Sequence, residues 1–502
     1  MEWNWTLLQL AVSCQLLYVF IKAWQWYKLR GVPPGPTGLP FVGYAAFLGT
    51  NPQDKLLELS KTYGKIFSLY MGPQLAIILN DFSSIQAALK GQSDRFAGRS
   101  RDFVFRRLAL EADGKSHGIT FHDGEVHKRA RRFTIQTLKE IGLNRSSTHE
   151  KILREIGLLL MTFADHRGAP FDPLYPITVC CCNAACVVCY GRQFDRGDPE
   201  FVEYLRGTEL GSKVIAQANG FQSGYPMLRF LPSVMFPLWS RILETTRINR
   251  RFIHQQVMEH RASFVEGEVR DYTDAFLRGE RRIVKNGLSA EDAFADEELS
   301  QNLRGLIQGG TGTTAVTLQW MMLFMVNHPE VQKWIHRELD QHVERLDLVR
   351  ASDRANLPYV EAVVCEVQRM ANITPFGLLR TNTKETTLLG YRIPTRSFIL
   401  PNFASINGDP ALWAEPGEFK PERFLDLVGK LQKPQHFLPF SLGKRSCVGQ
   451  SFAQTELFLV FSNIMHRFSI ECEDSTRPPS STERFTDGLC HPVPFKIRAI
   501  HR

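Results

Sequence analysis

The sequence has only a small excess of charge of one sign. Its 502 residues include 60 lysines and arginines against 52 aspartates and glutamates, which gives a formal net charge of +8. No basic run is long enough to indicate nucleic-acid binding, so nucleic acid is not an expected partner. A basic patch for an acidic protein or an anionic membrane is still compatible with this balance.

The cysteines lack a regular spacing. The chain has ten of them, and they do not form the framework of a secreted, disulfide-rich protein, which favours a reducing compartment. Five are crowded together: Cys180, Cys181, Cys182, Cys186 and Cys189. The last three have the spacing of radical enzymes that bind an iron–sulfur cluster, but on a helix they form an apolar stripe. We expect core packing and keep the cluster as the alternative.

The N-terminus lacks the basic start and the cleavage site of a signal peptide. The run from Trp5 to Ile21 is mainly apolar, close to the roughly 17–25 residues of a membrane span. Tryptophan and tyrosine flank this run, and basic residues follow it. We therefore predict that residues 1–30 are a single N-terminal transmembrane helix, a membrane anchor whose C-terminal side faces the cytosol.

A proline-rich connector follows the predicted anchor. Residues 32–40 read VPPGPTGLP, and proline both stiffens the backbone and removes hydrogen-bond donors. We predict a hinge over residues 31–50, with a proline-rich recognition motif as the alternative. Residues 51–502 then form the globular part of the chain.

Hydrophobic periodicity and end signals indicate a mainly helical globular part with a small β region. The expected helices cover residues 54–63, 123–141 (with Asp123 as cap), 200–211 and 296–327, and the expected β segments cover residues 66–71, 75–79 and 387–400. The long helix at 296–327 contains Gly305, Gly309, Gly310 and Gly312. Each glycine costs about 1 kcal/mol relative to alanine, which indicates close backbone approach or local unwinding.

One cysteine stands at the start of a helical pattern. Residues 440–449 read FSLGKRSCVG, and an apolar helical pattern follows. Unpaired N–H groups and the helix dipole favour an anion at such a position, so we expect the surroundings to lower the pKa of the Cys447 thiol.

This stretch resembles the heme-binding loop of the cytochrome P450 superfamily, F-x-x-G-x-R-x-C-x-G. Phe440, Gly443, Arg445, Cys447 and Gly449 match every fixed position. The resemblance implies the cytochrome P450 fold, mainly α with a small β region. It also implies one heme b, with Cys447 as the metal ligand and with Phe440, Gly443 and Arg445 in the cofactor-binding loop.

Further residues resemble other motifs of this family. Thr313, within GGTGTT, matches the alcohol that hydrogen-bonds dioxygen, and it is the expected catalytic residue. Gly312 stands where the family usually has a carboxylate, so the route of proton delivery is open. His127 and Arg131 stand at the W-x-x-x-R pair that binds a heme propionate, with histidine in place of tryptophan, and Arg380 stands at another propionate donor.

A second group resembles the family's structural network. Glu366 and Arg369 are three residues apart on an expected helix, and Arg423 follows downstream within PERF. In the family such residues form a buried network that locks the cysteine loop. Leaving one member of such a network unpaired costs about 3–5 kcal/mol.

The resemblance is strongest to microsomal animal members that act on drugs and steroids. It implies a monooxygenase in the endoplasmic reticulum membrane that faces the cytosol and inserts one oxygen atom from O2 into a lipophilic substrate. Electrons would come from NADPH through a flavoprotein reductase, which could dock on Lys128, Arg129, Arg132 and Lys444. The alternatives are a reductase-independent isomerase or lyase, which Gly312 leaves open, and a non-catalytic heme-binding protein.

One aliphatic and aromatic segment, residues 221–239, is interrupted by prolines and suggests membrane contact or a pocket lid. Packing in the core is the alternative.

Overall fold

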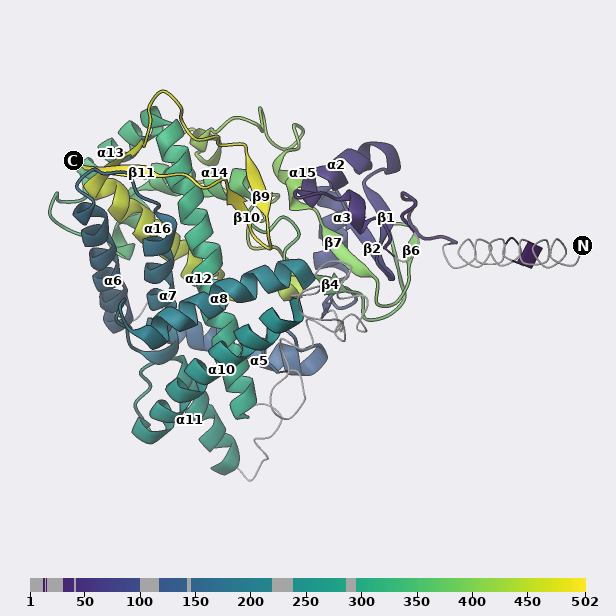
Figure 1. The fold of residues 1–502 in the computed structure, drawn as a ribbon, viewed down its shortest axis with the longest axis horizontal. Helices are drawn as coiled ribbons and strands as arrows, with labels where there is room; N and C mark the ends of the chain where they lie inside the picture. Colours follow the sequence, from purple (N-terminus) through teal and green to yellow (C-terminus); the bar gives the residue numbers. More distant parts are fainter. Residues whose placement is uncertain are drawn as a thin grey trace, which may run out of the picture.

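The computed structural model is mainly helical, with its largest sheet to one side of the helices (Figure 1). It describes residues 12–13, 15, 30–39, 42–99, 117–141, 146–218, 238–285 and 295–502. Most of the predicted anchor and most of the 221–239 segment therefore lie outside the described residues. No helix within these described ranges is both long enough and apolar enough to cross a membrane.

The helices make up the larger part of the molecule. They are α2 (Pro52–Tyr63), α3 (Phe82–Gln86), α5 (Gly124–Ile141), α6 (Ser146–Asp165), α7 (Leu174–Tyr190), α8 (Pro199–Ala218), α10 (Leu238–Ser263), α11 (Tyr272–Lys285), α12 (Asp296–Asn327), α13 (Pro329–His342), α14 (Pro358–Ala371), α15 (Phe403–Asn407) and α16 (Gln450–Arg467). Short helical turns include η2 (Ala87–Gly91), η5 (Pro421–Phe424) and η6 (Gly443–Arg445). The segment after Arg270 forms α11, whose residues 272–277 are buried and whose residues 278–283 are exposed or half-buried.

A five-stranded sheet has the order β1-β2-β7-β4-β3. Its strands are β1 (Ile66–Met71), β2 (Gln74–Leu79), β7 (Phe398–Pro401), β4 (Arg380–Thr381) and β3 (Gly98–Arg99). The predicted hairpin is confirmed, because β1 pairs with β2 in antiparallel register across Gly72 and Pro73. The 387–400 run is divided between β7 and a separate two-stranded sheet, β5 (Thr386–Leu388) and β6 (Tyr391–Ile393).

Helix α12 is the central element of the helical part, and the predicted boundaries of this helix are confirmed. Its 32 residues span about 48 Å. Acidic residues occupy its first turn, and Pro329 follows its end. It packs mainly against α7 and also contacts α16, α14 and α10.

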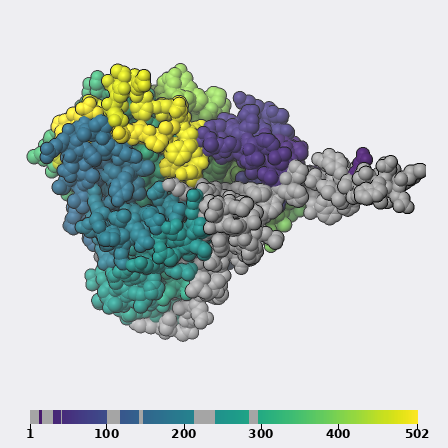
Figure 2. Space-filling model, viewed as in Figure 1, coloured from purple at the N-terminus to yellow at the C-terminus, as the bar shows by residue number. Residues whose placement is uncertain are grey.

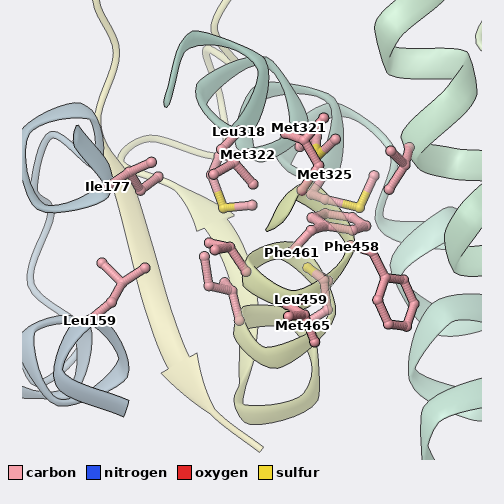
Figure 3. Packing of buried hydrophobic residues seen from close by; sticks show 14 of the residues in the cluster. Leu159, Ile177, Leu318, Met321, Met322, Met325, Phe458, Leu459, Phe461 and Met465 are labelled. Atoms are coloured by element: carbon pink, nitrogen blue, oxygen red, sulfur yellow. The ribbon is translucent and has the colours of Figure 1, made fainter. Parts of the chain in front are cut away.

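The largest apolar cluster lies where α6, α7, α12 and α16 meet (Figure 3). Met321, Met322 and Met325 of α12 face Phe458 and Phe461 of α16, and all of these side chains are buried. Burying a side chain of this size contributes about 1.5–3 kcal/mol. This packing fixes α16, which begins three residues after Cys447, against the long helix.

The cysteine-rich segment forms one continuous helix, α7. The thiols of Cys180, Cys181, Cys182, Cys186 and Cys189 are free and buried. Burial raises the pKa of Cys180, Cys181, Cys186 and Cys189 well above the usual value. Protonated thiols inside an unbroken helix agree with core packing and do not suit cluster ligation, which needs thiolates.

The C-terminal strands lie beside the N-terminal β region on the face shown in Figure 2. Arg484 of β9 (Arg484–Thr486) pairs with Asp54 of α2 at 2.7 Å, and its carbonyl accepts a hydrogen bond from Asn51 at 3.0 Å. Residues from the two ends of the chain therefore meet at this face.

Candidate active site

The loop before α16 is held closed by its own backbone. The Cys447 N–H donates to the carbonyl of Phe440 at 3.0 Å, and the Ser446 N–H donates to the carbonyl of Gly443 at 3.0 Å. Gly443 has φ +75, and a Cβ at this position would lie 1.8 Å from the Leu89 carbonyl oxygen. Only glycine allows this approach, which seats the loop on η2.

The Cys447 side chain is accessible, in contrast to the buried thiols of α7. Burial of its surroundings nevertheless raises the pKa of this thiol, although the Gly449 N–H and the Arg131 charge act in the opposite direction. The expectation of a lowered thiol pKa is therefore wrong for the protein alone. The helix N-terminus and one guanidinium do not outweigh desolvation.

Glu366, Arg369 and Arg423 form the network expected from the sequence. The Arg369 guanidinium binds both oxygens of Glu366 at 2.7 Å, and Arg423 Nε donates to Glu366 Oε1 at 2.9 Å. The side chains of Glu366 and Arg369 are buried. Arg369 also donates to the carbonyls of Asn407 and Pro416, which lie in the segment that leads to the cysteine loop.

Four arginines gather around the cysteine loop. Arg131 of α5 donates to the carbonyl of Ser446 at 2.7 Å and to its hydroxyl at 2.9 Å. Arg380 of β4 donates to the Ser441 hydroxyl at 2.9 Å. Arg445 donates to the Ala97 carbonyl at 2.8 Å and to Asp123 at 2.8 Å.

The fourth arginine, Arg99, was not singled out from the sequence. It lies on β3 directly opposite Arg380 of β4 in antiparallel register. It donates to the carbonyls of Thr120, Leu378 and Leu379 at 2.8–3.0 Å. A two-residue strand carries no hydrophobic period, so only the pairing with β4 shows why this arginine belongs to the site.

The arginine cluster has little negative charge to balance it. Burial, followed by the neighbouring arginines, lowers the pKa of Arg99 well below its usual value and that of Arg380 to about 10. Asp123 is the carboxylate that pairs with Arg445, and its Oδ1 also accepts the Arg99 N–H at 3.0 Å, which is more than the capping role expected for it. Like charges placed opposite each other across two strands are destabilising. An anionic group with several acceptor oxygens therefore fits between these side chains and Cys447.

His127 lies in the same shell, on α5, and is 4% exposed. Desolvation, and then the charges of Arg445, Arg131 and Arg99, lower its pKa to about 3. At neutral pH the imidazole is therefore uncharged and carries one N–H that can donate to an acceptor.

Thr313 lies in the middle of α12 and is partly exposed. Its hydroxyl donates to the Gly309 carbonyl at 2.6 Å, and its own carbonyl accepts from Thr317 Oγ1 at 2.8 Å. No hydrogen bond between described residues connects it to the arginine cluster. The structure connects Thr313 to the cysteine loop through the packing of α12 on α16.

Glu456 of α16 is a second residue that the sequence analysis did not single out. It is 0% exposed and lies beside the Cys181 thiol and the Thr314 hydroxyl, but neither carboxyl oxygen has hydrogen-bonding geometry to a partner. Burial raises the pKa of this carboxyl well above its usual value. In the sequence, Glu456 stands beside Leu457 in a helical pattern, and this pattern does not show which side of the helix is buried.

Two of the four residues expected to dock a reductase already have partners. Lys128 pairs with Glu125 at 2.5 Å, and Lys444 pairs with Asp94. Arg129 and Arg132 are exposed on α5.

Comparison with known proteins agrees with this geometry. Residues 33–499 match the family model for Cytochrome P450. Human Cytochrome P450 2U1 is 31% identical over 513 residues, which cover 96% of this chain and 92% of that protein. Cytochrome P450 2A10 of Oryctolagus cuniculus is 32% identical over 474 residues, 93% of either chain, and Cytochrome P450 2A3 of Rattus norvegicus is 32% identical over 482 residues, 95% of this chain and 94% of that protein. The chain therefore belongs to the cytochrome P450 family of monooxygenases, which use heme b bound through a cysteine thiolate.

Proposed function

We propose that Cys447 is the ligand through which this monooxygenase holds heme b, and that Arg99, Arg131, Arg380, Arg445 and His127 bind the propionates. The observation that carries this proposal is the group of four buried or half-buried arginines around the accessible Cys447. Bidentate guanidinium–carboxylate pairs are the strongest hydrogen bonds of this kind. When bound, heme b would supply the reductive activation of dioxygen, one atom of which enters the substrate.

The protein positions the ligand through rigid contacts. The Phe440 carbonyl and the close approach of Gly443 to Leu89 fix the loop that carries Cys447. The Glu366, Arg369 and Arg423 network fixes the segment before that loop. The Gly449 N–H and the Arg131 charge partly offset the desolvation that favours the thiol, and coordination to the heme iron would supply the remaining preference for the thiolate.

Thr313 is proposed as the alcohol that would hydrogen-bond dioxygen. Its hydroxyl now donates within α12, so its oxygen can accept, and a χ1 rotation would let it donate. Gly312 supplies no acid, so protons must reach Thr313 through water or another group.

We further propose that residues 51–502 form the catalytic domain, that residues 31–50 form a hinge, and that residues 1–30 anchor the protein in the endoplasmic reticulum membrane with the domain facing the cytosol. The substrate would be a lipophilic steroid, fatty acid or xenobiotic. Electrons would come from NADPH through a membrane-bound flavoprotein reductase. The exposed guanidinium groups of Arg129 and Arg132 support docking of an acidic partner near the cysteine loop.

The test is turnover of a panel of lipids, steroids and xenobiotics by the purified full-length protein with NADPH and the flavoprotein reductase. Product that carries one oxygen atom from labelled O2 is the expected result. An Arg129→Glu, Arg132→Glu variant should lower the rate of the first electron transfer while the spectrum of the bound heme stays unchanged. A panel member that is converted without NADPH or reductase would contradict the proposed electron route.

A further inference from the structure

Two histidines and one glutamate meet at a point that the proposed reaction does not use. His117 and His122 lie in the segment before α5, and Glu298 lies in the first turn of α12. His122 Nε2 is 2.6 Å from Glu298 Oε2, and His117 Nδ1 is 3.6 Å from the same oxygen. All three donor atoms lie within 4.8 Å of one another.

These separations are close to those of a zinc site. Zn²⁺ bound by histidine nitrogen and carboxylate oxygen at about 2.0–2.2 Å in a tetrahedron places its ligand atoms about 3.3 Å apart. The two distances to Glu298, 2.6 and 3.6 Å, lie on either side of this value. Movements of less than about 1 Å in the two imidazoles would therefore produce the geometry, and two histidines with one carboxylate leave a position for water.

The carboxylate is already oriented by groups outside the ligand set. Glu298 Oε2 accepts the Gly118 N–H at 2.9 Å, and Oε1 accepts from Asn302 Nδ2 at 3.4 Å. The Asn302 Oδ1 in turn accepts the Ile119 N–H at 2.9 Å. Partners of this kind orient metal ligands and raise metal affinity. The three side chains are 5–17% exposed, so an ion and its water can reach them.

A second group of histidine and carboxylates among the described residues, His260 with Asp271 and Asp274, has less room for an ion because its polar atoms already bind one another and an arginine. His260 Nδ1 and Nε2 contact the Gln256 carbonyl and Asp271 Oδ2, both at 2.9 Å. Asp274 is paired with Arg270, and Asp271 Oδ1 accepts the Asp274 N–H at 3.0 Å. A cation there would have to displace an arginine and a helix-capping bond, so this group is a structural ion-pair cluster.

We propose that His117, His122 and Glu298 bind one divalent transition-metal ion, and that Zn²⁺ is the ion that this ligand set fits. Binding releases to the solvent the proton that lies between His122 Nε2 and Glu298 Oε2, since both atoms then coordinate the metal. The ion ties residues 117–122 to α12. The same segment supplies the Ile119 and His122 carbonyls that accept from Arg445, so zinc also fixes one wall of the arginine cluster.

The experiment uses the full-length, heme-loaded protein without a histidine tag. A chelator first removes metal ions other than the heme iron. Zinc retained after gel filtration from a ZnCl2 solution is measured by mass spectrometry, and affinity is measured by calorimetry. One equivalent of zinc is expected. Glu298→Gln and His122→Gln should each weaken binding by at least about 100-fold, because even partners outside a ligand set change metal affinity by about 10–100-fold. His254→Gln, which removes an exposed histidine of α10, is the matched control and should keep the full equivalent.

A second measurement covers variants that fold poorly. Zinc at about 100 times its dissociation constant should raise the Tm of the parent by about 2–3 °C, and this rise should vanish in His122→Gln, which removes the most exposed side chain of the three. The proposal is overturned if the parent retains no stoichiometric zinc. It is equally overturned if zinc binding survives in both ligand variants or is lost in His254→Gln.

Discussion

Two groups of cysteines experience very different surroundings in this protein. The five thiols of α7 lie in a buried interior, close to the carboxyls of Glu155, Asp271 and Glu456, and burial raises the pKa of the Glu456 carboxyl well above its usual value. Cys447 lies in a shell of guanidinium groups, with a backbone N–H directed at its sulfur. Desolvation raises the thiol pKa in both places, so the pKa alone does not separate a ligand from a packing residue. The distinguishing features are accessibility and unbalanced positive charge.

The largest effect should come from the sulfur itself. Cys447→Ser should abolish the red-shifted Soret band of the reduced carbonyl complex, because serine does not supply the thiolate ligand. The triple variant Cys182→Ala, Cys186→Ala, Cys189→Ala should keep that band and lose only packing energy. Iron loss in the triple variant would show that the α7 thiols are ligands after all.

The second largest effect should come from the buried ionic network of Glu366, Arg369 and Arg423, which lies close to the segment before the cysteine loop. Glu366→Gln should lower the free energy of unfolding by about 3–5 kcal/mol, because it leaves Arg369 buried without its charge partner. Chemical denaturation of the heme-loaded protein measures this. Glu58→Gln breaks the exposed pair with Lys55 and should change stability by less than about 1 kcal/mol. Equal effects of the two variants would mean that the buried network contributes no more than a surface pair.

The neutral interior can be tested through Glu456. Its pKa is raised in the folded state, so the folded protein holds a proton that the unfolded chain releases above pH of about 4.3. The parent therefore loses stability as pH rises from there toward the folded pKa, by at most about 1.4 kcal/mol per pH unit.

Glu456→Gln removes this dependence, so the stability of the variant relative to the parent should increase between pH 5 and pH 8. Thermal unfolding across this range measures it. A constant difference between variant and parent would show that Glu456 ionises normally. Glu483→Gln, at an exposed site, serves as the control.

The contribution of the arginine cluster to heme binding can be tested by removing the charge of Arg99. Arg99→Gln should speed loss of heme to excess apomyoglobin by about 10-fold, the equivalent of one charge-assisted hydrogen bond of about 1.4 kcal/mol. Arg129→Gln, on the exposed face of α5, should leave this rate unchanged. If the two variants release heme equally fast, Arg99 does not contact the cofactor.

The smallest effect is expected at Gly312, on the helix that packs against both regions. Gly312→Asp should raise the product formed per NADPH oxidised by a few fold, because it places an acid beside Thr313. A positioned acid contributes about 10²–10⁴-fold to the rate of a proton-transfer step. The effect on the product ratio is smaller because proton transfer is only one of the steps that determine it. Thr313→Ala should lower this ratio. A parent that is already fully coupled and is insensitive to Thr313→Ala would show that protons arrive by another route.

The sequence predicted the elements that carry long patterns and the residues that carry complete motifs. Helix α12 and the β1–β2 hairpin were found because their periodicity and end residues agree. Glu366, Arg369 and Arg423 were found because their spacing is characteristic of the family. Arg99 and Glu456 were missed because one depends on strand pairing across 281 positions of the chain and the other on which face of α16 is buried. The predicted direction of the Cys447 pKa shift was wrong because the cost of desolvation depends on the packed surroundings, which a local motif does not contain.

The opposition of Arg99 and Arg380 in the β3–β4 register also has a consequence for biosynthesis. A newly made chain must bring two guanidinium groups together across one strand pair, so this corner should close only when an anion arrives to separate them. Delivery of the cofactor would then be a late step of maturation that the helical body does not need. Cells short of heme should accumulate a chain in which the core formed by α6, α7, α12 and α16 resists proteases and the β3–β4 corner is cleaved by them.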